Sequence, residues 1–230
     1  MSLSDARTLW QLLRGMPGDG NHAHRLEAFY GAQAADYDRF RERLLPGRAE
    51  LMEWLKPCPG ERVVELGAGT GRNPEFIRAT VPALEKLTLV DLCPALLAQA
   101  FERWAHAGNV CVVEADACTW RPGVPVDAVY FSYALTMIPD WRAAMENAVA
   151  MLRPGGRLAV VDFTVTARQP RLARSFWRKW FGHDGVHLNP EHAATLARLL
   201  PRHELREYRT TMPYLPGLTV PYYLFLGIKG

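Results

Sequence analysis

The sequence has no apolar run long enough to cross a bilayer, a crossing that needs about 20 consecutive apolar residues. It also has no basic-then-apolar signal segment at its start, which predicts a cytoplasmic protein. Cysteine is scarce, with four residues and no C-x-x-C pair. This pattern argues against a disulfide framework and favours reduced core thiols.

Charge of one sign is not in large excess, because the sequence has 27 Lys and Arg residues and 24 Asp and Glu residues, which give a net charge of +3. That balance gives no argument for a nucleic-acid partner, and we expect none. Repeats, low-complexity tracts and shifts of composition are also absent. With 230 residues, 49% of them hydrophobic, the chain can bury a full core, so we expect a single domain over residues 1–230.

Three alternating glycines follow an apolar run in residues 63–73, which read Val-Val-Glu-Leu-Gly-Ala-Gly-Thr-Gly-Arg-Asn. Gly67, Gly69 and Gly71 let the backbone turn sharply and approach a ligand closely after a buried strand. A dinucleotide fingerprint would require a glycine at the sixth position, where this chain has Arg72. The loop therefore predicts a nucleoside site without a pyrophosphate, and its alternative is a tight turn that binds nothing.

A second acid ends the apolar run 87–91, about 20 residues beyond the glycines. This spacing predicts that Asp91 binds ribose hydroxyls. Asp91 also precedes a predicted helix over 94–104, whose first turn it can cap. The two roles are compatible.

Strand-like and helix-like segments alternate along the rest of the chain. This order predicts an α/β fold with a doubly wound, seven-stranded, mostly parallel sheet and an antiparallel C-terminal strand. Ligands of such sheets bind at the carboxyl ends of the strands, where Gly67, Asp91, Asp116 and Ser132 fall. We expect strands at 63–66, 87–91, 110–114, 126–131, 157–162, 204–211 and 219–228, and helices at 94–104, 140–152 and 190–200.

The segment Glu65–Gly71 resembles motif I of class I S-adenosylmethionine-dependent methyltransferases, and Leu152–Gly156 (Leu-x-Pro-Gly-Gly) resembles a second hallmark of them. The resemblance implies a Rossmann-like methyltransferase fold with S-adenosyl-L-methionine as cofactor. It also implies an N-terminal helical lid over 1–48, with Tyr37 lying over the cofactor, and a substrate-side insertion over 165–189. The implied cofactor-binding residues are Tyr37, Glu65, Gly67, Ala68, Gly69, Gly71, Asp91, Leu92, Asp116, Ala117 and Ser132.

Scattered runs at 29–41, 44–48, 71–73, 132–139 and 180–188 are similar to the diacylglycerylhomoserine N-methyltransferases of betaine-lipid synthesis. This narrower resemblance implies methylation of the amine of a lipid head group. Alternative acceptors are phosphatidylethanolamine, a quinol or a soluble metabolite. A cofactor-binding regulatory protein without catalysis is an alternative of another class, and an NAD-dependent oxidoreductase is disfavoured by Arg72.

Two residues are our candidates beside the methyl acceptor. Tyr133 follows the strand at 126–131, and His187 can take a proton near neutral pH because an unperturbed histidine has a pKa near 6.5. The alternative for His187 is a structural histidine. His183 and His187 have an i, i+4 spacing, but Gly185 weakens a helix between them, and we expect no metal.

Residues 168–181 interleave five cations with four large aromatic residues, a mixture suited to a membrane interface. The segment predicts peripheral contact with the inner membrane face, and its alternative is packing on the protein's own core. An apolar stripe at 6–14 carries the same two readings, with core packing favoured.

Overall fold

The computed structural model describes residues 44–166, 168–183, 185–212 and 217–230. The predicted lid, except for residues 44–48, lies outside the described residues, as do Tyr37 and the stripe at 6–14. Among the residues that the structure describes, no helix combines the length and the apolar character needed to cross a bilayer.

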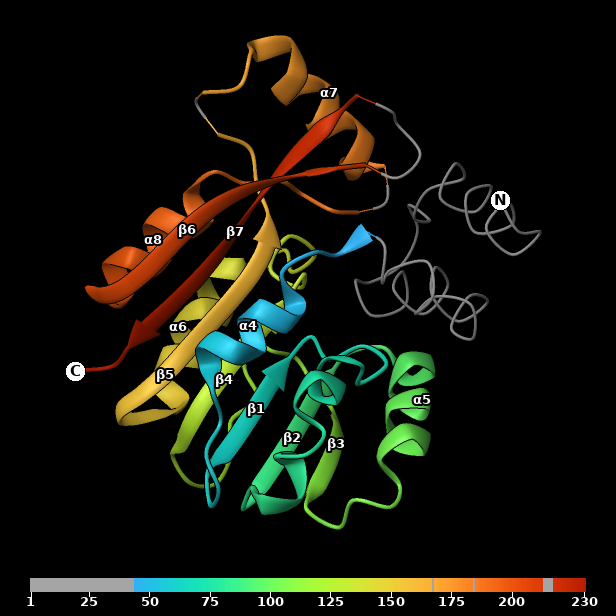
Figure 1. Ribbon diagram of the computed structural model, residues 1–230, viewed down its shortest axis with the longest axis vertical. Helices are drawn as coiled ribbons and strands as arrows, with labels where there is room; N and C mark the ends of the chain where they lie inside the picture. Colours follow the sequence, from blue (N-terminus) through green and yellow to red (C-terminus); the bar gives the residue numbers. More distant parts are fainter. Residues whose placement is uncertain (1–43, 167, 184, 213–216) are drawn as a thin grey trace.

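A seven-stranded sheet forms the centre of the molecule, in the order β3-β2-β1-β4-β5-β7-β6 (Figure 1). β7 pairs antiparallel with β5 and β6, and the other pairs are parallel, as the sequence predicted. The strands are β1 (Arg62–Leu66), β2 (Lys86–Asp91), β3 (Val110–Glu114), β4 (Val126–Ser132), β5 (Leu152–Phe163), β6 (Arg202–Thr211) and β7 (Thr219–Ile228).

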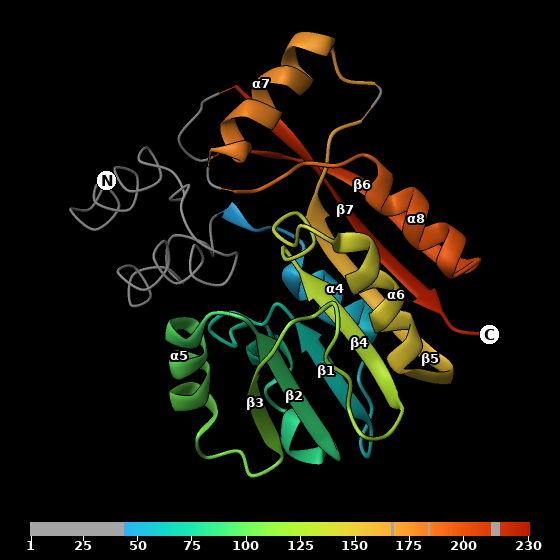
Figure 2. The ribbon, with the colours of Figure 1, turned by 180° about the vertical axis from the view of Figure 1, so that it is seen from behind.

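Helices cover both faces of the sheet (Figures 1 and 2). One face packs against α4 (Arg48–Leu55) and α5 (Pro94–Trp104), and the core there includes Leu51, Val63 and Ala100. The other face packs against α6 (Trp141–Met151) and α8 (Glu191–Leu199). α7 (Arg171–Gly182) stands beyond the carboxyl end of β5 in both views.

The chain after Gly71 forms two short 3-10 helices, η1 (Asn73–Ile77) and η2 (Val81–Ala83), before β2 begins. Pro74 and Pro82 lack the N–H that a longer α-helix would use in its interior. Each proline sits at the first or second position of its short helix, where this loss is tolerated.

The order of the strands places a topological switch point beside β1. The chain runs outward from β1 through β2 to β3 and then returns to β4 on the other side of β1. Crevices at the carboxyl ends of strands beside such a switch point bind ligands in open α/β sheets. The sequence after β1, β2 and β4 therefore meets at one edge of the sheet.

Candidate functional site

The glycine loop after β1 is packed too closely for side chains. Gly67, Gly69 and Gly71 have φ of 75°, 55° and 65°, a conformation that L-residues with a Cβ rarely adopt. A Cβ on Gly67 would lie 2.4 Å from the Cβ of Ala134. A Cβ on Gly71 would lie 3.0 Å from the Cβ of Ala100. The glycines are therefore required by this turn.

Backbone hydrogen bonds fix the same loop to the end of β2. The N–H groups of Gly67 and Ala68 both donate to the carbonyl oxygen of Val90, at 2.8 and 3.0 Å. Arg72, which replaces the third glycine of a dinucleotide fingerprint, forms an ion pair with Glu75 of η1. The loop thus keeps its tight turn without the glycine that dinucleotide sites use next to the pyrophosphate.

Asp91 connects the glycine loop to Cys93, the residue that precedes α5. Its Oδ2 accepts a hydrogen bond from the N–H of Gly69 at 2.8 Å, and its Oδ1 accepts one from the N–H of Cys93 at 2.9 Å. The carboxylate therefore holds the loop and the residue that precedes α5. Capping of the first turn of α5 by Asp91 stays a prediction. Its binding of ribose stays a prediction, and half-buried Leu92 lies beside it.

The turn after β3 carries the two residues expected at the adenine edge. The side chain of Asp116 is exposed, and its Oδ1 accepts from the N–H of Cys118 at 2.8 Å. Ala117 is buried, and its carbonyl oxygen accepts from Asn147 of α6 at 2.9 Å. These contacts order the turn, and contact with adenine stays a prediction.

A buried polar cluster lies at the carboxyl ends of β1 and β4. Oε1 of Glu65 accepts from Nδ2 of Asn73 at 2.5 Å, and Oε2 accepts from the hydroxyl of Tyr130 at 2.7 Å. The Ser132 hydroxyl donates to Oδ1 of Asn73 at 3.4 Å. Burial raises the pKa of Glu65 to about 8, although both hydrogen bonds oppose that rise and Asp91 adds to it.

Sequence reasoning did not assign Asn73 and Tyr130 to the site. A signal for them existed, because an acid in a buried strand requires hydrogen-bond donors. Tyr130 lies opposite Glu65 in the register of β1 and β4, and Asn73 comes two residues after Gly71.

On the acceptor side, Tyr133 has a φ of 56° and directly follows β4. Its hydroxyl donates to the carbonyl oxygen of Pro46 at 2.6 Å, and its ring centroid lies 4.7 Å from that of Phe163. Burial raises the pKa of Tyr133 well above its usual value. The geometry favours a positioning role over proton transfer, and contact with an acceptor stays a prediction.

His187 is held beside the same loop. Its backbone N–H donates to the carbonyl oxygen of Thr136 at 2.6 Å, and its side chain is exposed. His183 and His187 do not share a helix, because α7 ends at Gly182. In the described part of the chain, no three His, Cys, Asp or Glu residues form a group that could hold a metal ion.

Asp162 fixes the loop after β4, a role that the sequence did not indicate. It is fully buried, with Oδ2 accepting from the N–H of Thr136 at 3.0 Å and Oδ1 accepting from the Thr136 hydroxyl at 2.8 Å. Burial raises the pKa of Asp162 to about 7, against the opposing hydrogen bonds of Thr136 and Phe163. Asp162 therefore positions the segment that carries Tyr133.

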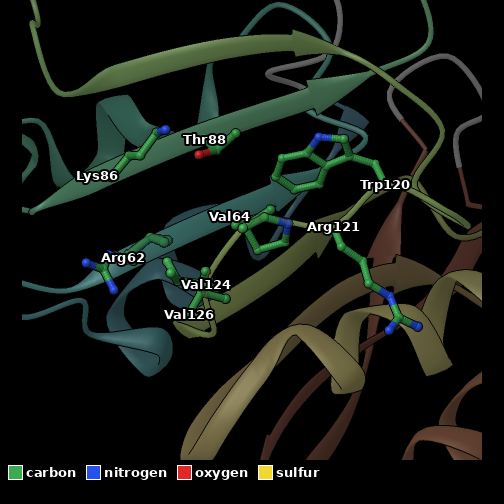
Figure 3. A pocket seen from close by; sticks show the side chains of 11 residues that line it. Arg62, Val64, Lys86, Thr88, Trp120, Arg121, Val124 and Val126 are labelled. Carbon is green, nitrogen blue, oxygen red and sulfur yellow. The ribbon is translucent and has the colours of Figure 1, made fainter.

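A cavity of about 280 Å³ lies at the opposite edge of the sheet (Figure 3). Arg62, Lys86 and Val126, which line it, come from the starts of β1, β2 and β4. Trp120 lies across these strands, whereas Arg121 points away and donates from Nε to Oδ1 of Asn147 at 2.8 Å. This cavity is therefore separate from the glycine loop.

Comparisons with known proteins agree on one family. A family model described as "Methyltransferase domain" matches residues 32–207. Trans-aconitate 2-methyltransferase of Klebsiella pneumoniae is 38% identical over 120 residues, which cover 52% of this chain and 45% of that protein. The ubiquinone/menaquinone biosynthesis C-methyltransferase UbiE of Roseobacter denitrificans is 25% identical over 160 residues, covering 64% and 62%.

A solved structure shares the fold. The N-methyltransferase NodS from Bradyrhizobium japonicum, in complex with S-adenosyl-l-homocysteine, matches with a TM-score of 0.60 and 16% identity. The match covers 99% of each chain. The alignments with trans-aconitate 2-methyltransferases span about half the length of those relatives.

Proposed function

Because the chain belongs to the methyltransferase domain family, we propose that it is an S-adenosylmethionine-dependent N-methyltransferase. Its proposed acceptor is the amine of a lipid head group, diacylglycerylhomoserine, which becomes the trimethylated betaine lipid. The glycine loop and Asp91 fit the cofactor, since the loop permits close backbone approach and carries Arg72 where a dinucleotide site has glycine.

The observation that supports an amine acceptor is an aromatic cluster at the carboxyl ends of β4 and β5. The ring of Phe163 lies 4.7 Å from Tyr133 and 5.0 Å from Phe181, centroid to centroid. An amine that gains methyl groups becomes a quaternary ammonium, which can be surrounded by aromatic faces but cannot donate a hydrogen bond. The basic, aromatic α7 next to this cluster supports an acceptor carried by a membrane.

Bound S-adenosylmethionine supplies an electrophilic methyl group on a sulfonium. The chain's residues have to align a neutral amine with the sulfur–methyl bond and exclude water. The glycine loop and Asp91 would hold the cofactor, while Asp162 fixes the loop of Tyr133 at the acceptor side. The amine has to be neutral to accept the methyl group that bound S-adenosylmethionine would supply, and His187 would take the proton that the amine gives up.

Methylation of a soluble acid is a second candidate. The 38% identity to trans-aconitate 2-methyltransferase favours it, although that similarity covers 52% of this chain. The basic side chains of α7 would bind such an acid as readily as a lipid phosphate.

The deciding experiment measures transfer of labelled methyl groups from S-adenosylmethionine into two lipid extracts, of which one contains diacylglycerylhomoserine and the other only ordinary phospholipids. We expect label in the trimethylated homoserine lipid. Label in phosphatidylethanolamine alone would replace the acceptor, and an unlabelled lipid phase in both extracts would direct the search to soluble acids.

Two variants test the acceptor side in the same assay. We expect Tyr133→Phe and His187→Ala to lower the rate of transfer, and His106→Ala, which changes an exposed histidine after α5, to leave it unchanged. If both acceptor-side variants retain the full rate, Tyr133 and His187 are not at the acceptor.

A further inference from the structure

α7 presents two apolar stripes, of which only one is buried. Trp177 and Phe181 are buried, with ring centroids 5.8 Å apart, and Phe181 packs on Phe163 of β5. The second stripe consists of Leu172, Phe176 and Trp180, whose exposed fractions are 86%, 41% and 40%. A helix that only covered the core would have no reason to carry the second stripe.

The exposed residues form a continuous surface. Leu172, Phe176 and Trp180 are spaced four residues apart, so they lie one above another along the helix. The rings of Phe176 and Trp180 are stacked, with centroids 5.9 Å apart and an interplanar angle of 29°. The other large exposed hydrophobic residues of the described chain are distributed over different elements: Phe76, Phe101, Val124, Leu205 and Leu218.

The charge beside this stripe has one sign. From Arg168 to His183 the sequence contains five cations and no acid. Arg171, Arg178 and Lys179 are exposed, and they form no ion pair with another described residue. Cations beside an exposed apolar stripe are typical of helices that lie in the interface of an anionic bilayer.

We infer that α7 docks this protein on the surface of an anionic lipid bilayer. Leu172, Phe176 and Trp180 enter the head-group region, and Lys179, which lies on the same side of the helix, contacts lipid phosphates. An acidic protein surface would match the charge but not the three apolar side chains, which gain most where they leave water for acyl chains.

The position of α7 relates this surface to the acceptor side. A row of rings leads from Trp177 through Phe181 and Phe163 to Tyr133, with centroid distances of 5.8, 5.0 and 4.7 Å. Figures 1 and 2 show α7 at the end of the molecule toward which β1, β4 and β5 point. Docking through α7 therefore turns the carboxyl ends of the strands toward the bilayer. This orientation is useful only if the methyl acceptor is a lipid, so this part of the inference rests on the proposed function.

Sedimentation with vesicles tests the surface without any methylation. Vesicles of phosphatidylcholine mixed with phosphatidylglycerol contain no diacylglycerylhomoserine, so binding is measured apart from catalysis. We expect the protein to bind these vesicles and to bind pure phosphatidylcholine less well. Lys179→Gln should lower the partition coefficient about fivefold at low salt, the effect of one cation near the bilayer surface.

The apolar stripe has its own variant and controls. Leu172→Ala/Phe176→Ala should weaken vesicle binding roughly tenfold, since both side chains would leave the head-group region. Phe101→Ala on α5 and Arg202→Gln on β6 remove an exposed ring and an exposed cation elsewhere, and both should bind as the unchanged protein does. Absent binding, or equal binding of the α7 variants and the controls, would overturn the docking surface.

The docking surface and the proposed lipid acceptor are tested by independent measurements. Vesicle binding without label in any lipid extract would retain the surface and reject the proposed function. Label in the homoserine lipid without vesicle binding would retain the proposed function and reject the docking surface.

Discussion

Glu65 is a carboxyl group with both oxygens hydrogen-bonded and no exposed surface. Burial is the dominant effect on it, because it raises the pKa to about 8 against the two hydrogen bonds. Because the pKa of Glu65 is higher in the folded chain than in the unfolded chain, the protonated carboxyl group stabilises the fold. This contribution is complete below pH 4.5 and is lost as the pH rises through 8.

Glu65→Gln should therefore flatten the pH dependence of the unfolding free energy. Between pH 5 and 8 we expect the unchanged protein to lose roughly 2 to 4 kcal/mol more than the variant. Urea denaturation at several pH values measures this difference. Glu102→Gln, which alters an exposed acid of α5, should keep the original slope; an equally steep slope in Glu65→Gln would show that Glu65 is ionised in the folded protein.

A substitution at Gly67 tests whether the backbone of the glycine loop requires glycine. Its φ of 75° and the 2.4 Å approach of an added Cβ to Ala134 predict that Gly67→Ala lowers the unfolding free energy by about 2 kcal/mol or more. Gly108→Ala is the matched control, because nothing lies within 4 Å of its Cβ position. Chemical denaturation compares the two, and similar losses would mean that the turn relaxes around the new methyl group.

At the scale of elements, α6 and α8 meet through an unusual pair. The ring of His192 is buried 4.5 Å from that of Trp141, and neither of its nitrogens has a hydrogen-bond partner among the described residues. Burial, with a smaller contribution from Arg142, lowers the pKa of His192 to about 4. The packing of α8 on α6 therefore depends on a neutral imidazole.

A lowered folded-state pKa gives stability that is complete above pH 6.5 and is lost as the pH falls toward 4. His192→Phe should remove up to about 3 kcal/mol of this acid sensitivity while keeping an aromatic ring against Trp141. Thermal unfolding from pH 6.5 to 4.5 measures the effect. His106→Phe, at an exposed position, should retain the sensitivity; retention by His192→Phe as well would contradict the assignment.

The elements also show how far sequence patterns reach. α5, β3 and β7 have the predicted bounds, because proline starts α5 and β-branched runs define the strands. β5 begins at Leu152 and not at Arg157, since Gly155 and Gly156 form backbone hydrogen bonds with Lys229. Such pairing across a long sequence separation has no local signal.

At the scale of the whole molecule, a ligand that binds only the folded state raises its stability. S-adenosylhomocysteine at about 100 times its Kd should add about 2.7 kcal/mol, which corresponds to a rise in Tm of roughly 5 to 10 °C for a chain of this size. Thermal shift measurements with NAD provide the control, and we expect no shift. A shift with NAD alone would restore the dinucleotide alternative.

The sequence by itself determined the alternation of strands and helices of an α/β fold and the glycine loop, because both are encoded in local periodicity and in the special dihedral angles of glycine. It also identified Asp91 as a candidate ribose ligand, because the number of residues between Asp91 and the glycine loop can be counted in the sequence. The tertiary structure alone decided that Tyr130 and Asn73 share the carboxyl group of Glu65, and that Asp162 holds Thr136. It also decided which stripe of α7 is buried, because burial depends on what distant segments of the chain bring to each side of a helix.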